Sequence, residues 1–193
     1  MRSMFQICVK KIGDGWFGAL LGCNGKLFAT SFSRELRKNV IVGLVEHLPL
    51  GSSFVESQPH ETALRVFRSL HLIYEGRPPT HRFELNMGRT SPFVRKVLLL
   101  TSAIPYGFVA TYGEIAKAIG KRGAARAVGN AEARNPFSLL IPCHRVIRSN
   151  LAVGGYGCGS DTKRMLLERE GVVFVNTCVS RENLWVPRSK GSN

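Results

Sequence analysis

Apolar and polar positions alternate along the first third of the chain and then change to a helical spacing. The stretches FQICVKK and WFGALLGCNGKLFATSF have the pattern of β-strands, and Asn24-Gly25 between two apolar runs is a hairpin-turn signal. From Ser33, which we predict to be an N-cap, apolar residues recur every three or four positions in two successive helices. They are Leu36, Val40, Leu44, Val45 and Leu48, and then Leu64, Phe67, Leu70 and Tyr74. This half predicts a small α/β domain with an antiparallel sheet.

The next segment, EGRPPTHRFELNMGRTSP, is rich in Gly, Pro and polar residues and predicts a connector. We expect a short strand over residues 83–85 and a domain boundary near residue 88. Ser91 then precedes Pro92 as an N-cap before a proline at the first helical position. The apolar stripe of that helix is Val94, Val97 and Leu98, and we expect it to end before the turn IPYG.

Two short helices are predicted in the second half. In TYGEIAKAIG, Thr111 and Glu114 form a capping-box pattern and Gly120 marks the end of the helix. The following segment AARAVGNAEARN predicts a helix of small residues from which Arg126 and Arg134 project. The pair is typical of a helix-turn-helix, although a plain helical hairpin has the same pattern.

The second helix leads through Asn135-Pro136 into the apolar segment 137–141, which we predict to be a strand that ends at Cys143. The glycine-rich segment AVGGYGCGS follows and predicts a loop whose backbone can approach a ligand closely. Asp161 is the expected cap of the last helix, and Gly171 its end. Residues 172–193 read as a polar, basic, partly disordered tail.

Composition narrows the classes of protein. The chain has 193 residues, of which 44% are hydrophobic, with neither a bilayer-spanning apolar run nor the apolar core of a signal peptide. We therefore expect it inside the cell, in the cytoplasm or, in a eukaryote, the nucleus. Its formal net charge of +14 favours a polyanionic partner, with nucleic acid ahead of a membrane surface, although a solvated basic surface would give the same count.

The five cysteines do not form a recognisable disulfide or metal framework. Their number is odd, and none of them is in a CxxC pair: they are Cys8, Cys23, Cys143, Cys158 and Cys178. Cys8 and Cys23 lie in predicted strands and are expected to act as small buried hydrophobes. Cys158 and Cys178 could pair only if the fold brings them together.

Cys143 is the only cysteine with a histidine beside it, in PCHR. The thiolate is the reactive form of cysteine, and a free thiol has a pKa of about 8.5. Neighbours on a strand point to opposite faces, so His144 would reach Cys143 directly only if Pro142 starts a turn, and otherwise through a water molecule. Glu170 is the best candidate to orient the imidazole. A buried structural thiol and a core histidine are the alternative, which the surrounding helices and glycine loop make less attractive.

The motifs IPCHRV, TYGEIA, AARAVGNA, RNP and LLEREGV together resemble the O6-alkylguanine-DNA alkyltransferases, or methylated-DNA-protein-cysteine methyltransferases. The match extends over roughly residues 90–171. It implies a ribonuclease H-like α/β domain over residues 1–88, a mainly α domain with a helix-turn-helix of winged-helix type over 89–171, and the tail. Alkyltransferase-like relatives carry tryptophan in place of the cysteine, and Cys143 therefore indicates a transferring member.

The resemblance implies direct repair of O6-alkylguanine, mainly O6-methylguanine with O4-methylthymine as a further substrate. The alkyl group would move irreversibly to Cys143 of the same chain. His144 would act through water as the base, and Glu170 would orient it. Tyr112 would donate a hydrogen bond to a guanine that has been flipped out of the duplex, and Asn135 would be a hinge before Pro136. Tyr112 and Asn135 also fit plainer roles as a helix-start aromatic and a turn former.

The resemblance also implies which residues contact DNA and the base. Arg126 would fill the gap left by the flipped base, although a phosphate contact would suit it as well. The helix face expected in the minor groove, and the projecting arginine, comprise Ala124, Ala127, Gly129, Ala131 and Arg134. The guanine pocket is expected between the Cys143 turn and the glycine loop. Its walls and loop tip are Val146, Tyr156, Gly157 and Cys158.

We expect no cofactor, and we predict no zinc because no histidine closely follows Cys23. The thioether product is stable, so each molecule is expected to act once. The expected partner is double-stranded DNA carrying the lesion, bound by a monomer; whether binding is cooperative is left open. Two rival functions are a lesion-binding protein without transfer and a Cys-His thiol hydrolase acting on a small substrate. A transcriptional regulator that accepts alkyl groups from phosphotriesters is weaker, since the chain lacks the length for the extra domain.

Overall fold

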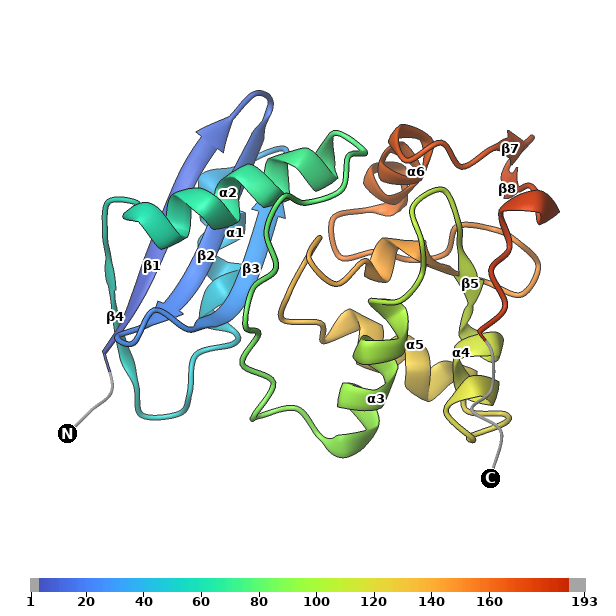
Figure 1. The fold of residues 1–193 in the computed structure, drawn as a ribbon, viewed down its shortest axis with the longest axis horizontal. Coiled ribbons are helices and arrows are strands. Elements are labelled where there is room, and N and C mark those ends of the chain that lie inside the picture. Colours follow the sequence, from blue (N-terminus) through green and yellow to red (C-terminus); the bar gives the residue numbers. More distant parts are fainter. Residues whose placement is uncertain (1–3, 188–193) are drawn as a thin grey trace. The chain divides into compact units, whose positions relative to one another are not determined.

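A computed structural model describes residues 4–187, which separate into two units (Figure 1). The first unit extends to Arg89 and also includes Pro136–Leu140; the second comprises Thr90–Asn135 and the chain from Ile141 onward. Within the described residues, no helix has both the length and the apolar character to cross a membrane.

The alternating N-terminal segments form a four-stranded sheet with the order β3-β2-β1-β4. The elements of this unit are β1 (Met4–Ile12), β2 (Gly15–Gly22), β3 (Leu27–Ser33), α1 (Arg37–Val45), β4 (Ser53–Glu56) and α2 (Glu61–Tyr74). The first three strands are antiparallel, and the β2–β3 turn contains Asn24-Gly25 as predicted. The fourth strand runs parallel to β1, because the chain crosses from one edge of the sheet to the other through α1. The sheet is therefore mixed, and the prediction of a purely antiparallel sheet is corrected.

Helices cover both faces of this sheet, and two neighbouring residues of β2 explain how. Phe17 packs edge-on against the ring of Tyr74 on α2, with ring centroids 5.6 Å apart. A side chain at Gly18, on the opposite face, would collide with Val40 and Leu44 of α1. Adjacent strand residues point to opposite faces, and β2 is therefore buried on both sides, with α2 across the face visible in Figure 1.

The start of α1 differs from the prediction. Ser33 is not its N-cap, because the helix begins at Arg37 after Leu36, whose side chain makes no capping bond. The Ser33 hydroxyl instead accepts backbone N–H groups of Glu35 and Leu36, at 3.2 and 3.4 Å. The serine thus closes the turn between β3 and α1, a role that the helical spacing does not distinguish from capping.

Two predicted strands, over residues 83–85 and 137–141, are not formed as strands. Each is joined to β3 by an isolated bridge, through Leu85 and Phe137 respectively. In the second segment, the Thr30 N–H donates to the Pro136 carbonyl and its hydroxyl to the Ser138 carbonyl, both at 2.8 Å. Both of these hydrogen bonds go to Thr30 of β3, and the segment does not continue into a strand.

The second unit is mainly helical. Its elements are α3 (Pro92–Thr101), β5 (Ala110–Thr111), α4 (Tyr112–Ala118), α5 (Ala125–Ala133), β6 (Val146–Ile147), α6 (Ser160–Arg169), β7 (Phe174–Val175) and β8 (Cys178–Val179). Ser91 caps α3 by accepting from the N–H of Val94, and Thr111 and Glu114 form the predicted capping box of α4. Asp161 does not cap α6: the N-cap is Gly159, with φ at 89°, and Asp161 lies in the first turn.

Two apolar clusters form the interior of the second unit. The larger joins α3, α4, α5 and β6 and consists of Val97, Ile104, Ala110, Ile115, Ala116, Val128, Ala131 and Val146. The smaller includes Val172 and Val179, which are 4% and 2% exposed. Residues 172–187, read as the start of a disordered tail, are therefore ordered through β7, β8 and a 3-10 turn. The remaining part of the predicted tail, residues 188–193, lies outside the described residues.

Candidate active site and DNA-binding helices

Cys143 lies in a tight turn rather than on an extended strand. Pro142 precedes a single turn of 3-10 helix, Cys143–Arg145, in which the Arg145 N–H donates to the Pro142 carbonyl at 2.9 Å. The turn leaves Cys143 half-buried and directs His144 and Arg145 into the unit, where they are 0% and 4% exposed. Of the two arrangements considered from the sequence, the turn that begins at Pro142 is the one observed.

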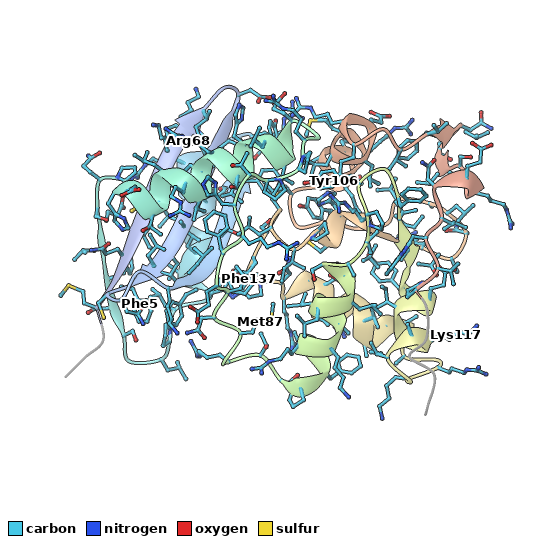
Figure 2. The ribbon with its side chains drawn as sticks, in the orientation of Figure 1. Phe5, Arg68, Met87, Tyr106, Lys117 and Phe137 are labelled. Carbon is cyan, nitrogen blue, oxygen red and sulfur yellow. The ribbon has the colours of Figure 1, made fainter. Side chains whose placement is uncertain are left out.

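The buried imidazole and guanidinium share one carboxylate, which follows the end of α6. His144 Nε2 donates to Glu170 Oε1 at 3.0 Å, and Arg145 donates through Nε to Oε2 at 2.7 Å and through Nη2 to Oε1 at 2.8 Å. The third guanidinium nitrogen donates to the Ile104 carbonyl at 2.6 Å, and the guanidinium stacks 3.9 Å from the ring centroid of Tyr106 (labelled in Figure 2). The predicted partnership of His144 with Glu170 is present.

Burial and these hydrogen bonds together set the pKa values of Glu170 and His144. Burial alone would raise the pKa of Glu170, but hydrogen bonds from His144 and Arg145 bring it below its ordinary value. Burial lowers the pKa of His144, against the opposing influence of Glu170. The imidazole is therefore neutral at physiological pH, with its proton on Nε2. Its Nδ1 is buried and has no hydrogen-bond partner among the described residues, which leaves a basic nitrogen available.

The Cys143 thiol is held in its protonated form at rest. Burial, and after it the charge of Glu132, raises the pKa of Cys143 to about 12. A hydrogen bond from Asn135 and the charge of Lys163 act in the opposite direction. Asn135 is itself held by donating to the Ile141 carbonyl at 2.9 Å, and the predicted hinge residue therefore also contacts the thiol. Such a thiol reacts only if a nearby base accepts its proton.

Tyr112, the first residue of α4, is half-buried and lies against α5. A Cβ at Gly129 would stand 3.8 Å from its ring, and the ring is 5.8 Å from Lys163 Nζ. Burial, followed by the charges of Glu132 and Cys143, raises the pKa of Tyr112. Its hydroxyl is therefore protonated over the physiological range and can donate.

The helix face predicted to meet DNA is only partly accessible. Arg126, Ala127 and Arg134 are exposed. Ala131, however, is 2% exposed and belongs to the larger apolar cluster, and Ala124 packs against the same cluster. Ala131 is therefore removed from the predicted DNA-contacting set, because a small residue there serves the packing of α5 against α3.

The residues predicted to line the guanine pocket also differ in how deeply they are buried. Val146 is fully buried in the larger cluster, so its side chain forms core rather than wall, while its carbonyl accepts from Lys163. Tyr156 is half-buried, with its ring centroid 6.4 Å from that of His144. At the loop tip Gly157 and Cys158 are exposed. None of the five cysteines is in a disulfide, so Cys158 and Cys178 are not covalently joined.

Two buried ionisable residues beside the thiol were not predicted from the sequence. Lys163 is 0% exposed, and its Nζ donates to the carbonyls of Val146 and Gly155 at 2.6 and 3.4 Å. Glu132 is 6% exposed and accepts from the Thr101 hydroxyl at 2.5 Å. The sequence signal was their helical spacing: Lys163 precedes buried Leu166 by three positions, and Glu132 follows buried Val128 by four.

The fold and the site together define a protein that presents a half-buried cysteine, with a buried imidazole in the same turn, beside a pair of helices. Residues 92–172 match the model of the family described as 6-O-methylguanine DNA methyltransferase, DNA binding domain. Among curated proteins, a methylated-DNA-protein-cysteine methyltransferase of Saccharolobus islandicus is 46% identical over 116 residues, which are 60% of this chain and 74% of the relative. The protein of that name from Mycolicibacterium paratuberculosis is 50% identical over 82 residues, covering 42% of this chain and 50% of its own.

Solved structures give the same result over a longer part of the chain. The Mycobacterium tuberculosis protein OGT, crystallised in complex with DNA, has a TM-score of 0.67 at 29% identity, covering 86% of this chain and 92% of its own. The O6-methylguanine-DNA methyltransferase of Pyrococcus kodakaraensis has a TM-score of 0.67 at 32% identity, covering 88% and 100%. The chain belongs to the methylated-DNA-protein-cysteine methyltransferase family, and it is a DNA-repair methyltransferase.

Proposed function

We propose that this protein moves the alkyl group of O6-alkylguanine in duplex DNA onto the sulfur of Cys143, once per molecule. The observation that carries the proposal is the half-buried thiol in the same turn as a neutral imidazole, whose tautomer is fixed by Glu170. A lesion-binding protein without transfer would have no use for such a nucleophile and base.

The proposed step conserves protons and charge. The Cys143 proton passes through a bridging water to His144 Nδ1, the sulfur attacks the alkyl carbon, and the bond from that carbon to guanine O6 breaks. The electron pair of the broken bond stays on the guanine, which takes up one proton from water in place of the alkyl group, while the His144 imidazolium returns the Cys143 proton to water. The products are an uncharged thioether and normal guanine. Because a thioether is not hydrolysed by these groups, the protein is consumed by the reaction.

Tyr112 and the glycine loop are proposed to bind the base. The Tyr112 hydroxyl, which keeps its proton, donates to the guanine as negative charge develops on its ring. The backbone of the loop, with Gly157 at its exposed tip, approaches O6, and the ring of Tyr156 stacks beside the base. Asn135 holds the thiol in the orientation for attack through its own hydrogen bond.

The helices α4 and α5 are proposed to act as a helix-turn-helix of winged-helix type, and the first unit as a ribonuclease H-like domain. The exposed Arg126 enters the duplex where the base has left, and Arg134 contacts phosphate. Ala127 lies close to the minor-groove floor, where readout depends little on sequence. A net charge of +14 supports affinity that falls steeply with salt. We propose that a monomer binds.

Mass spectrometry of the protein after a limiting amount of O6-methylguanine duplex tests transfer, site and stoichiometry together. We expect the peptide containing Cys143 to gain one methyl group per lesion repaired, and Cys143→Ala to gain none while it still binds DNA. Binding without any mass gain would favour a lesion sensor. More product than protein, with indifference to DNA, would favour a thiol hydrolase.

A further inference from the structure

A second buried carboxyl group lies beside the thiol and takes no part in the His144–Glu170 pair. Glu132 stands on the inner face of α5 with Val128 and Ala131, and only 6% of it is exposed. Its Oε1 accepts from the Thr101 hydroxyl on α3. Its Oε2 is buried and meets no hydrogen-bond partner among the residues that the structure describes. An ionised carboxylate in this position therefore lacks a hydrogen bond to one of its two oxygens.

Ionisable groups from three other elements face Glu132. Cys143 comes from the 3-10 turn, Tyr112 from α4 and Lys163 from α6, and a negative charge on Glu132 raises the pKa of each. Arg148 is exposed and acts on Tyr112 and Lys163 but is not among the influences on Glu132. Among the residues that the structure describes, the cation that acts on Glu132 is therefore Lys163.

Lys163 is fixed in place rather than free to move toward a single partner. Two of its three N–H groups donate to the carbonyls of Val146 and Gly155, and the side chain is completely buried. Burial lowers the pKa of Lys163 to about 8, so below that pH one ammonium stands between two acids, the Glu132 carboxyl and the Cys143 thiol. In a poorly solvated interior, a single positive charge stabilises one negative charge far better than two.

We propose that Glu132 tunes the reactivity of Cys143 by competing with the thiolate for the ammonium group of Lys163. While Glu132 is neutral, the thiolate has the cation to itself. Once Glu132 ionises, it takes the cation, and thiolate formation is opposed. Glu132 touches neither DNA nor the alkyl group and acts through Lys163, so it is a positioning residue. The consequence for alkyl transfer rests on the function proposed above.

This competition predicts a distinctive dependence on pH. The pKa of Glu132 is raised to about 7, first by burial, with Thr101 and Lys163 opposing the shift. Below that pH the carboxyl is neutral, and removing it should change nothing. Above it, the ionised carboxyl depresses the thiolate fraction, and its removal should increase Cys143 reactivity.

Reactivity with iodoacetamide tests this without DNA. The rate of modification of the peptide containing Cys143 is measured by mass spectrometry, for the full chain and for Glu132→Gln, from about pH 5.5 to about pH 8, because burial lowers the pKa of Lys163 to about 8 and its charge is lost above that pH. We expect equal rates at the acid end and a reaction of Glu132→Gln that becomes faster as the pH rises, toward a limit of about tenfold, equivalent to one pKa unit of the thiol. A rate ratio that does not change with pH would overturn the proposal.

Two further variants keep the test decisive. Glu168→Gln removes an exposed charge from α6, and we expect its pH profile to match that of the unmodified chain. Thr101→Val removes the donor to Glu132 and should shift the divergence to higher pH, which supplies a second readout if Glu132→Gln folds poorly; an unshifted profile would count against the competition. Because iodoacetamide needs no lesion, failure of alkyl transfer and failure of this proposal give different results.

Discussion

The two buried glutamates of the second unit stand in opposite electrostatic situations. Both oxygens of Glu170 receive donors from His144 and Arg145, and its pKa lies below the ordinary value. Within the described part of the chain Glu132 has one hydrogen-bond donor, Thr101, and burial raises its pKa to about 7. Similar burial therefore gives a permanent carboxylate in one place and a titrating group in the other. The number and charge of the donors decide the outcome.

The largest loss of stability and of transfer is expected from replacing Glu170, whose two oxygens both accept hydrogen bonds. Glu170→Gln would leave the Arg145 guanidinium buried without its charge partner, which costs about 3–5 kcal/mol of folding free energy. The imidazole would also lose its tautomer control, and we expect transfer to fall by at least about 100-fold. Denaturant unfolding and single-turnover transfer measure the two effects. Unchanged stability would contradict the ion-pair network.

The depressed pKa of Glu170 also predicts how folding stability changes in acid. Because its folded-state pKa is below the unfolded value, its stabilisation is complete above about pH 4.5 and is lost as the pH falls further. The free energy of unfolding, measured at decreasing pH from about pH 5, should therefore become the same for the original chain and for Glu170→Gln. Curves that remain parallel would show that the stabilisation is not electrostatic.

Replacing Glu132, in contrast to replacing Glu170, should stabilise the folded protein. Glu132 has a folded-state pKa raised from 4.5 to about 7, so folding stability declines as the pH rises between these values. Glu132→Met removes that decline, and we expect a gain of about 3 kcal/mol above pH 7, absent below about pH 4.5. The melting temperature at both pH values is the measurement. A loss of stability at the alkaline end would mean that Glu132 is better compensated than its contacts indicate.

A smaller effect is expected from the single donor to Glu132. Thr101→Val keeps the shape of the side chain and removes one hydrogen bond to a carboxylate, worth about 1.5–3 kcal/mol when the acceptor is charged. The destabilisation should therefore be larger at about pH 8 than at about pH 5.5, where the carboxyl is protonated. An equal loss at both would assign the effect to packing.

Arg126 contacts neither Glu132 nor Glu170, so its substitution serves as a reference for the substitutions of these two residues. Arg126→Ala should leave stability within about 0.5 kcal/mol, as is usual for an exposed position. Repair of duplex DNA should fall, while reaction with free O6-benzylguanine should not, because only the duplex needs its gap filled. Equal losses on the two substrates would remove the intercalation role.

Local sequence signals predicted much of the second unit. The cap at Ser91, the box formed by Thr111 and Glu114, and the helix end at Gly171 depend on neighbours along the chain, and the structure confirms each. The contact between His144 and Glu170 was predicted from the family resemblance together with the chemistry of an imidazole. Its supporting partner Arg145 was visible in the PCHR motif but was not assigned a part.

Features that depend on tertiary packing were missed. The parallel β4 pairs with β1 only after a crossover, and Ala131 is buried because α3 covers it. Glu132 and Lys163 lie on the buried faces of their helices. Because charged residues are almost always exposed, their residue type predicts exposure although their spacing places them with the buried residues. Only the three-dimensional arrangement places them beside Cys143 and reveals that they share one compensating charge.

The most direct test of the contrast is a carbon-detected NMR titration of the glutamate carboxyl groups, assigned from the spectra of Glu132→Gln and Glu170→Gln. We predict that Glu132 titrates near pH 7 and that Glu170 titrates below the ordinary glutamate value. Titration of both groups together near the ordinary value, or of Glu170 above Glu132, would contradict the account.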